Sequence, residues 1–574
     1  MKRYSYLLCL IGVLLLIPTT PLSAQVEKEV EVSKQFVPKV ATATKPAMEP
    51  RFTDTVKIRP EIDYTVTPLS LRTTLVTRPI RPAKVTYWNF NRPRPFYLRA
   101  GVGAPWQSVI DFSAATQNPG TGFAMGYLNH SGRYARLKND FGDRNRATEL
   151  YNRIGFSGGK YIGRHTAEAN IEYNHRYLRR WGIYYPSSMP LPGMNVGYGE
   201  LIGRIRMGDD FLDLNRLNFE LAVDAAYFMD HSEPLLDGRQ GDQVDVGVSG
   251  RIGRKIGRKG RFSLGVGYLS KQGARSLDAY RQQLIHASAR YGVDGERLRL
   301  EVGLDYYNDR VNAPTIGDGA ESNNYFLPFG RLEYNLLRTK AFRPFVEVDG
   351  TLSTNDYRSL THLNPFVLTG EWLPKSTIDY GHRGGIVGSF GRERFAYRAY
   401  VELTIRKNHL FQTFVALNND TPEEYFMGWM LPRQERLTLV GLGGEINYRP
   451  TTELSFDAAV KLYTLDDDAA WSAGVAEING HIAARYEGRK IRAGVKVEVE
   501  SERGWSILSP ADGAVLGRFE APFAVNVMAD VEWVLNSQWS LFLEGRNLAH
   551  QTLYRFPMYR DYGIGAVVGA RWLF

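Results

Sequence analysis

Three groups of residues in this chain have the types and spacing that chemistry requires. The first, Gly155-Phe156-Ser157-Gly158-Gly159, satisfies the G-x-S-x-G pattern of a serine nucleophile. That pattern exposes its serine only on a sharp turn between a strand and a helix, whereas Lys160 and Tyr161 continue a strand-like stretch. Glycines that make room for side-chain packing are the better interpretation, so we predict no catalytic residue and no enzyme.

The second group is an acidic triplet, Asp466-Asp467-Asp468, in an expected turn. Clustered carboxylates bind hard cations such as Ca²⁺, and a solvated turn would have the same composition. The ten histidines include no pair at metal-ligand spacing within one element, and the only cysteine, Cys9, lies in the N-terminal apolar stretch. The triplet is a weak Ca²⁺ candidate, no other metal site is expected, and no cofactor is predicted.

The third group combines basic and aromatic side chains, with Arg176, Arg179 and Arg180 beside Tyr177 and Trp181. Cationic side chains next to amphipathic rings suit the anionic head groups of a membrane surface. Single exposed arginines would show the same pattern. We predict that Arg176, Arg179, Arg180 and Trp181 contact lipid head groups.

The elements that would position these groups are strands. One face of the C-terminal stretch carries Ile564, Ala566, Val568, Ala570, Trp572 and Phe574, and the other carries Gly565, Val567, Gly569, Arg571 and Leu573. A period of two predicts a strand between two different environments. The same alternation recurs at 217–227, 298–306, 454–463, 491–500 and 523–535.

Strand length decides between a water-soluble sheet and a membrane. Strands of soluble sheets are usually about five or six residues long, whereas those expected here run to about ten to fifteen, enough to cross a bilayer at a tilt. Lipid cannot satisfy unpaired backbone groups, so the sheet must close on itself. We predict an all-β transmembrane antiparallel β-barrel of about 22 strands over residues 96–574. Long loops are expected at one end, at 133–147, 179–195, 356–375, 406–434 and 502–521.

The N-terminal residues have the pattern of a targeting signal. A basic start, an apolar stretch from Leu7 to Ile17 and the small-residue site Leu22-Ser23-Ala24 predict a signal peptide over residues 1–24. Residues 25–95 hold nine prolines, which restrict helices and central strands. We expect a short irregular periplasmic or lumenal segment, either solvated or added to the sheet edge of a periplasmic or outer-membrane protein partner.

An exported barrel predicts the outer membrane of a Gram-negative bacterium, with its lipid and lipopolysaccharide as partners. The basic residues behind the formal charge of +10 are spread singly through the strands, so nucleic acid is not an expected partner. Side chains expected to face the lumen carry both signs, which predicts water and salt bridges inside. They are Arg299, Glu301, Asp305, Arg492, Lys496, Glu498, Asp530, Glu532, Glu544, Arg546 and Arg571.

The C-terminal residues resemble a known family. Glu544-Gly545-Arg546-Asn547-Leu548, then Tyr554, Pro557, Tyr559, Arg560 and Gly563, and a last strand ending in Phe574 are similar to the terminal signature of TonB-dependent receptors. The resemblance implies a 22-stranded barrel. It also implies that Asn547 and Leu548 close the penultimate strand, and that Tyr554 and Pro557 lie in the last outer loop.

Members of that family carry an N-terminal globular plug that makes transport energy-dependent, and this chain departs from that pattern. Residues 25–95 are short and proline-rich, without the alternating strands of a plug. Phe52-Thr53-Asp54-Thr55-Val56-Lys57 and the run from Phe90 to Tyr97 resemble a plugless group of TonB-receptor-like outer-membrane proteins.

The leading expectation is therefore a non-enzymatic barrel that acts as a subunit or scaffold of an envelope complex, or as a blocked conduit. A barrel this wide would be an open hole unless something filled it. A TonB-linked importer with a reduced or separate plug and a passive porin remain alternatives. An outer-membrane hydrolase would rest on Ser157 and on scattered acids and histidines alone.

Overall fold

The computed structural model describes residues 94–117, 120–182, 193–234, 240–312, 321–337, 340–367, 375–416, 430–464, 474–509 and 513–574. The expected signal peptide (1–24) and nearly all of the proline-rich segment (25–95) lie outside the described residues. The acidic triplet at 466–468 lies outside them as well. The described residues belong to one compact unit that begins at Tyr87.

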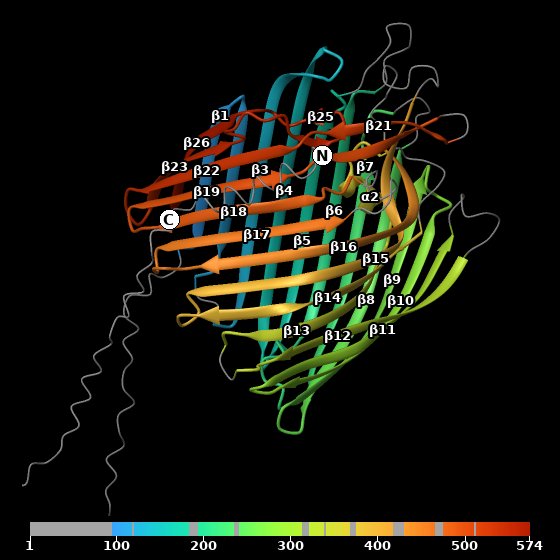
Figure 1. Cartoon of the computed structure of the whole chain (residues 1–574), viewed down its shortest axis with the longest axis vertical. Helices are drawn as coiled ribbons and strands as arrows, with labels where there is room; N and C mark the ends of the chain where they lie inside the picture. The colour runs from blue at the N-terminus through green and yellow to red at the C-terminus, as the bar shows by residue number, and fades with distance from the viewer. Residues whose placement is uncertain are drawn as a thin grey trace, which may run out of the picture. The chain divides into compact units, whose positions relative to one another are not determined.

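Twenty-four strands are hydrogen-bonded into one sheet; two of them, β20 and β21, branch from β15, and the other 22 close into an antiparallel barrel (Figure 1). The wall strands are β1 (Phe96–Ala104), β2 (Gln107–Ala115), β3 (Gly122–Lys138), β4 (Arg144–Ile162), β5 (His165–Arg179), β6 (Asn195–Gly208), β7 (Asn218–Asp230), β8 (Gly241–Ile256), β9 (Gly260–Arg275), β10 (Arg281–Asp294), β11 (Leu298–Asn312), β12 (Glu321–Tyr334), β13 (Arg343–Ser353), β14 (Thr377–Phe390), β15 (Phe395–Val415), β16 (Leu431–Tyr448), β17 (Leu454–Thr464), β18 (Ile478–Glu487), β19 (Ile491–Glu500), β22 (Ala524–Val534), β23 (Trp539–Arg546) and β26 (Gly565–Leu573). The elements outside the wall are α2 (Tyr357–Leu363), β20 (Arg503–Leu508), β21 (Val515–Ala521), β24 (Tyr554–Phe556) and β25 (Tyr559–Arg560).

The last strand closes the barrel against the first. β26 pairs with β1 in a continuous register from Tyr97 opposite Leu573 to Ala104 opposite Ala566. Phe96 and Phe574 exchange two backbone hydrogen bonds of 3.0 Å. The fold class and the number of strands predicted from the sequence are therefore confirmed.

The two faces of the wall differ as the alternation predicts. Val568 is 57% exposed on the outer face, whereas the adjacent Val567 is 2% exposed on the inner face. Large apolar side chains cover the outer face of many strands, among them Ile154, Ile205, Val266, Phe326, Val401, Ile482 and Leu543. At the end that holds the C-terminus, the rings of Trp539, Trp572, Phe574 and Phe96 stack in sequence. An apolar band edged by aromatic rings is the surface of a barrel that spans a membrane.

The longest connections lie at the end opposite Phe574, although the β1–β2 turn and the β3–β4 and β9–β10 connections at that end are short. Two expected loops are shorter than predicted, because the flanking strands extend into them. β3 reaches Lys138 and β4 begins at Arg144, inside the expected loop 133–147. β15 likewise extends to Val415 and β16 begins at Leu431. Among the described residues, no helix has the length and apolar character needed to cross a membrane.

One glycine at the closing seam tests this geometry. A Cβ added at Gly569 would lie 2.2 Å from the Ala100 carbonyl oxygen and 2.5 Å from the Phe542 ring. Overpacking of this kind costs about 1 to 3 kcal/mol, so Gly569→Ala should lower the unfolding temperature of the barrel. That temperature is read from gel electrophoresis as the point at which the band of the folded protein shifts to the position of the heat-denatured protein. Gly203→Ala is the matched control, since a Cβ there meets nothing within 4 Å. Equal unfolding temperatures for the two variants would contradict the close packing at the β1–β26 seam.

Candidate functional site

The loops at the end opposite Phe574 pack into one hydrophobic cluster. Wall residues contribute to it, including Ala147 on β4 and Phe414 on β15. Loop residues contribute as well, including Tyr357, Trp505 and Met558. β4 and β15 are eleven strands apart in the chain order of a 22-strand ring, so they lie on opposite sides of the lumen. The cluster therefore crosses the opening, and we call the described parts of three loops, residues 354–367 with 375–376, 501–509 with 513–523, and 547–564, the cap. Figure 1 places α2, β21 and β25 together at this end.

Aromatic stacking holds the centre of the cap. The rings of Phe366 and Tyr559 lie parallel with centroids 3.8 Å apart. Trp181 meets Tyr559 edge-on at 5.7 Å. Phe366 is 3% and Tyr559 4% exposed, and burial raises the pKa of the Tyr559 hydroxyl. These rings join the loop before β14, the loop after β5 and the last loop of the chain.

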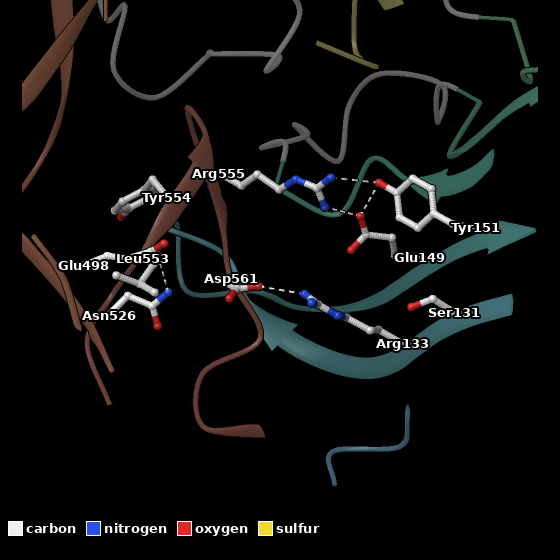
Figure 2. Close-up of a pocket in the computed structure, with 10 residues that line it drawn as sticks. All are labelled: Ser131, Arg133, Glu149, Tyr151, Glu498, Asn526, Leu553, Tyr554, Arg555 and Asp561. Carbon is white, nitrogen blue, oxygen red and sulfur yellow. Dashed lines mark hydrogen bonds and ion pairs between the residues drawn. The ribbon is translucent and has the colours of Figure 1, made fainter. Parts of the chain in front are cut away.

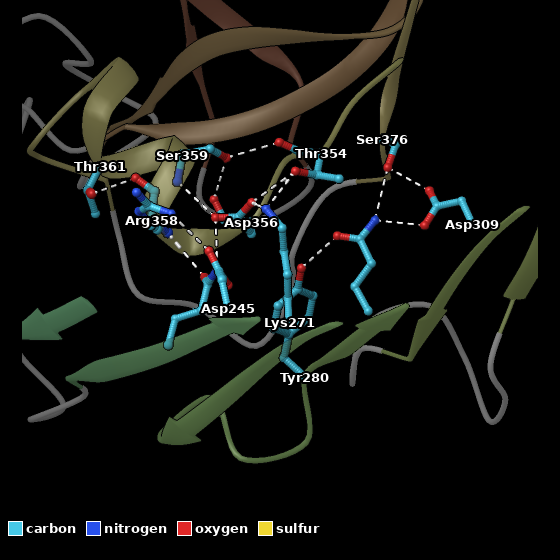
Figure 3. A network of polar contacts seen from close by, with 12 residues as sticks. Asp245, Lys271, Tyr280, Asp309, Thr354, Asp356, Arg358, Ser359, Thr361 and Ser376 are labelled. Carbon is cyan, nitrogen blue, oxygen red and sulfur yellow. Dashed lines mark hydrogen bonds and ion pairs between the residues drawn. The ribbon is translucent and has the colours of Figure 1, made fainter. Parts of the chain in front are cut away.

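A polar network fastens the start of α2 to the inner wall (Figure 3). Asp356 is the N-cap of α2 and accepts a hydrogen bond from the Ser359 amide at 3.0 Å. The Lys271 ammonium, on β9, forms an ion pair with the same carboxylate and donates to Thr354 Oγ1 at 2.7 Å. Gln243, on β8, donates to Asp356 Oδ1 at 3.0 Å. One buried carboxylate thus joins the helix cap to two wall strands.

The helix itself adds further ties to the wall. The Arg358 guanidinium pairs with Asp245 at 3.0 Å and with Glu200. The Tyr357 hydroxyl donates to Asp230 at 2.8 Å. Together these contacts anchor α2 to β6, β7 and β8, so the loop lies inside the barrel wall and not above it.

The network makes the cap sensitive to acid. Burial alone would raise the pKa of the Asp356 carboxyl, but Lys271 and the hydrogen bonds from Ser359 and Gln243 outweigh it and hold the pKa below the usual 3.8. A carboxyl with a lowered folded pKa contributes stability that is present above its unfolded pKa and lost as the pH falls through the folded value. We expect proteolytic cleavage of loop 354–376 to stay slow at neutral pH and to accelerate only below the usual carboxyl pKa of 3.8, as the pH falls through the lowered pKa of Asp356. Cleavage rates that do not change over that fall in pH would contradict this role.

Two of the polar cavities formed by the described residues lie within the lumen among these elements. The larger, of about 790 Å³, is lined by charged and polar side chains that include Arg99, Asp111, Glu172 and His362. The second, of about 530 Å³, lies between the wall and the last loop (Figure 2). Such mixed-charge walls hold water and polar solutes and do not favour one sign of ion.

The last loop reaches across the second cavity to the wall (Figure 2). Arg555 pairs with Glu149 on β4 and donates to the Tyr151 hydroxyl at 2.9 Å. Arg133, on β3, pairs with Asp561 at 3.1 Å. The loop is thus fixed at two points to the β3–β4 wall.

Most of the predicted lumenal residues lie in ion pairs with residues of the same strand or of strands one or two positions away in the wall. Arg571 pairs with Glu532 at 2.7 Å, and Asp305 pairs with Arg290 at 2.5 Å. Further pairs are Glu301–Arg261, Arg492–Glu532, Lys496–Glu498, Asp530–Arg485, Arg299–Glu333 and Glu544–Arg99. Arg546 lines the larger cavity. Ser157 lies within β4, opposite Met125 and Asn170, and not on a turn before a helix.

The residues of the C-terminal signature have structural roles in the cap and the seam. Asn547 follows β23 with φ at 48°, and its side chain accepts from the Gln551 amide at 3.0 Å. The Tyr554 hydroxyl donates to Asp140 at 2.8 Å, which ties the last loop to the β3–β4 hairpin. Leu548 follows Asn547 at the end of β23, Pro557 lies between β24 and β25, Gly563 has φ at 71°, and Phe574 stacks on Trp572.

The basic and aromatic group at the end of β5 is placed differently from the prediction. Arg180 and Trp181 are each 5% exposed. Arg180 donates to the Gly193 and Glu233 carbonyls at 2.5 and 3.1 Å. Arg176 donates to the Thr361 carbonyl at 2.5 Å, and Arg179 is the last residue of β5. Backbone carbonyls of the same chain thus accept hydrogen bonds from Arg176 and Arg180, and Trp181 packs against the cap. The positions of these three side chains do not support contact with lipid head groups.

The residues that build the cap have no distinctive pattern in the sequence. Asp356, Arg358 and Phe366 lay inside an expected loop, and the wall partners Gln243 and Lys271 lay inside expected strands. One local signal was present: Asp356 stands three residues before Ser359, the spacing at which an aspartate caps the start of a helix by accepting a hydrogen bond from a backbone amide. Among the described residues, no group of three or more His, Cys, Asp or Glu side chains could hold a metal ion.

The geometry defines a class: a wide transmembrane β-barrel whose mouth is covered by inward-folded loops. No protein-family model matches the chain, and no curated protein sequence matches it. Solved structures do match in fold. The FrpB iron transporter from Neisseria meningitidis has a TM-score of 0.64 and 11% identity, covering 84% of this chain and 82% of that chain.

Two further structures give the same result. The ferric-catecholate import receptor Fiu from E. coli has a TM-score of 0.61 and 10% identity, over 84% of this chain and 82% of that chain. The pyoverdine-binding FpvA from P. aeruginosa has a TM-score of 0.60 and 11% identity, over 83% of this chain and 71% of that chain. The chain is thus similar to siderophore and iron receptors in fold, which agrees with the TonB-dependent receptor signature at its C-terminus. The barrel, its apolar band and these neighbours fit the Gram-negative outer membrane.

Proposed function

We propose that this protein is a TonB-receptor-like outer-membrane barrel without a conventional plug. It acts as a subunit or scaffold of an envelope complex, or as a blocked conduit whose opening its own cap controls. Its partners are outer-membrane lipid and a periplasmic or outer-membrane protein.

One observation carries the proposal, namely the cap that joins opposite walls of the barrel. A hydrophobic cluster runs from Ala147 on one wall to Phe414 on the other. The ion pairs of Asp356 and Arg358 hold α2 against the inner face of the wall. A barrel of 22 strands would otherwise leave a wide aqueous channel. Packed loops of this kind suit a closed protein better than a passive porin.

Purification tests the scaffold part of the proposal. The full-length protein, extracted in mild detergent from the membrane in which it is made, should copurify with a stoichiometric periplasmic or outer-membrane protein. Salt washes should leave that partner bound. Recovery of the barrel alone, at every detergent tested, would leave only the blocked conduit.

A TonB-linked importer is the second candidate, and the printed names of its structural neighbours favour it: an iron transporter and a ferric-catecholate import receptor. An importer would take up a ferric ligand in cells, and uptake would stop when the proton-motive force is removed. Uptake that does not depend on the proton-motive force would reject this candidate and leave the scaffold or conduit.

A further inference from the structure

Four cations face one another on the outer side of the β3–β4 hairpin. Arg136 lies directly opposite Arg146, and Lys138 directly opposite Arg144, in the antiparallel register. All four side chains are exposed. Like charges placed directly opposite each other in a sheet destabilise it. The hairpin therefore carries a local repulsion that an anion would relieve.

The register assigns these four side chains to the outer face. Leu137, which alternates with them on β3, packs against the hydrophobic cluster of the cap. Ala147, which alternates with them on β4, is 0% exposed in the same cluster. Because successive side chains on a strand point to opposite faces, Arg136, Lys138, Arg144 and Arg146 point away from the lumen.

No carboxylate of the described residues lies within ion-pair distance of these four cations. The hairpin tip contains two acidic residues, Asp140 and Asp143. On the lumenal side, the Asp140 carboxylate forms an ion pair with Arg560 and accepts a hydrogen bond from the Tyr554 hydroxyl. Asp143 lies in the turn, one residue before β4. Within the described residues, the four exposed cations of the outer face have no acidic partner.

Aromatic and polar side chains place these cations relative to the membrane. Trp106 is 79% exposed in the β1–β2 turn, and its carbonyl accepts from the Tyr134 amide at 2.8 Å. Tyr134 precedes Arg136 by two residues, or about 7 Å along the strand. Tryptophan and tyrosine mark the boundary between lipid and water. The cations therefore lie on the water side of this boundary. The β3–β4 hairpin extends past β2, whose first residue, Gln107, lies opposite Arg133 (Figure 1).

A hydrogen-bonded row on the same face marks where the apolar band ends. Ser108 bonds to His130 at 2.8 Å, His130 to Asn152 at 2.7 Å, and Asn152 to His175 at 3.2 Å. Below this row lie apolar side chains, including Ile154 at 52% and Phe156 at 54% exposure. Along the hairpin, apolar side chains are followed by polar, then aromatic, then cationic ones, so the cations lie farthest from the level of the acyl chains.

We infer that the outer face of the β3–β4 hairpin binds the phosphate groups of a phosphorylated glycolipid of the outer leaflet. Arg136, Lys138, Arg144 and Arg146 hold the phosphates, and Tyr134 and Trp106 lie at the level of the head group. The site replaces the position predicted at Arg176 to Trp181, and it does not depend on what the barrel transports or assembles with.

Lipid binding to the full-length protein in detergent tests the inference. The probe is diphosphorylated lipid A, with its dephosphorylated form for comparison, and native mass spectrometry gives the apparent affinity. Each cation near an anionic lipid surface contributes about 1 kcal/mol, so Arg136→Gln with Arg146→Gln should weaken binding about 30-fold. Lys138→Gln with Arg144→Gln should do the same. Each double variant removes a like-charge pair, so its thermal stability in lipid-free detergent should not fall.

The matched control is Arg258→Gln with Lys259→Gln, in the exposed β8–β9 turn at the opposite end of the barrel. This control should bind lipid A as the unmodified protein does. Three outcomes would overturn the inference: unchanged binding in both hairpin variants, equal binding of dephosphorylated lipid A, or complete displacement of lipid A by millimolar inorganic phosphate. The last of these would mark a site for a free anion.

Discussion

A Lys271→Met protein is expected to have an open cap. The side chains of Lys271 and Asp356 are 9% and 1% exposed, so the substitution leaves a buried carboxylate without its counter-charge. Removing one partner of a buried ion pair costs about 3 to 5 kcal/mol, and this cost falls on the contacts that hold the loop to the wall. We expect loop 354–376 to be cleaved by added protease at least about tenfold faster than in the unmodified protein.

The charge-neutral double variant separates the lost ion pair from a general packing defect. In Asp356→Asn the new amide side chain keeps an oxygen that can accept from the Ser359 amide, because asparagine is also a favoured N-cap residue. Lys271→Met combined with Asp356→Asn should therefore restore much of the protease resistance. A double variant that is cleaved as fast as Lys271→Met alone would show that the ion pair does not hold the cap.

Truncation of Phe366 should loosen the cap from its apolar side. Phe366 is 3% exposed and stacks on Tyr559 at 3.8 Å, and truncating a buried phenylalanine to alanine costs about 3 to 5 kcal/mol. Hydrogen exchange should quicken at amides that bond to the cap, such as that of Ala416, which donates to the Leu508 carbonyl at 2.9 Å. Amides of the β1–β26 seam should not change.

The control for this variant is Leu212→Ala, a side chain that is 85% exposed in the β6–β7 connection. It should leave the exchange of the cap unaltered. Exchange at Ala416 that is equal in Phe366→Ala and Leu212→Ala would mean that the aromatic stack does not stabilise the cap.

The wall of the barrel could be predicted from the sequence because its information is local. Alternation at Ile564 to Phe574 requires only neighbouring residues, and the length of each strand distinguishes a membrane wall from a soluble sheet. The ends of the strands were harder to predict. β3 and β4 were expected to stop near 132 and to restart near 148, because Arg136, Lys138, Arg144 and Arg146 are the polar residues that loops also contain.

The cap could not be predicted, since its contacts are distant in the chain. Asp356 meets Lys271 across 85 residues and Gln243 across 113. α2 has only seven residues, too few to show a helical period of apolar side chains. In the Arg176 to Trp181 run, alternation with the exposed Ile171 and Tyr173 already places Arg176 on the lumenal face. Arg180 and Trp181 lie beyond the end of β5 at Arg179, where alternation no longer fixes the direction of a side chain.

Planar-bilayer recording of the pure full-length protein tests most directly whether the barrel is closed by its own cap. We expect no large steady conductance from the unmodified protein at neutral pH, and long-lived open events when Lys271 is replaced by Met. A large steady conductance from the unmodified protein would contradict a closed barrel and would favour a passive porin.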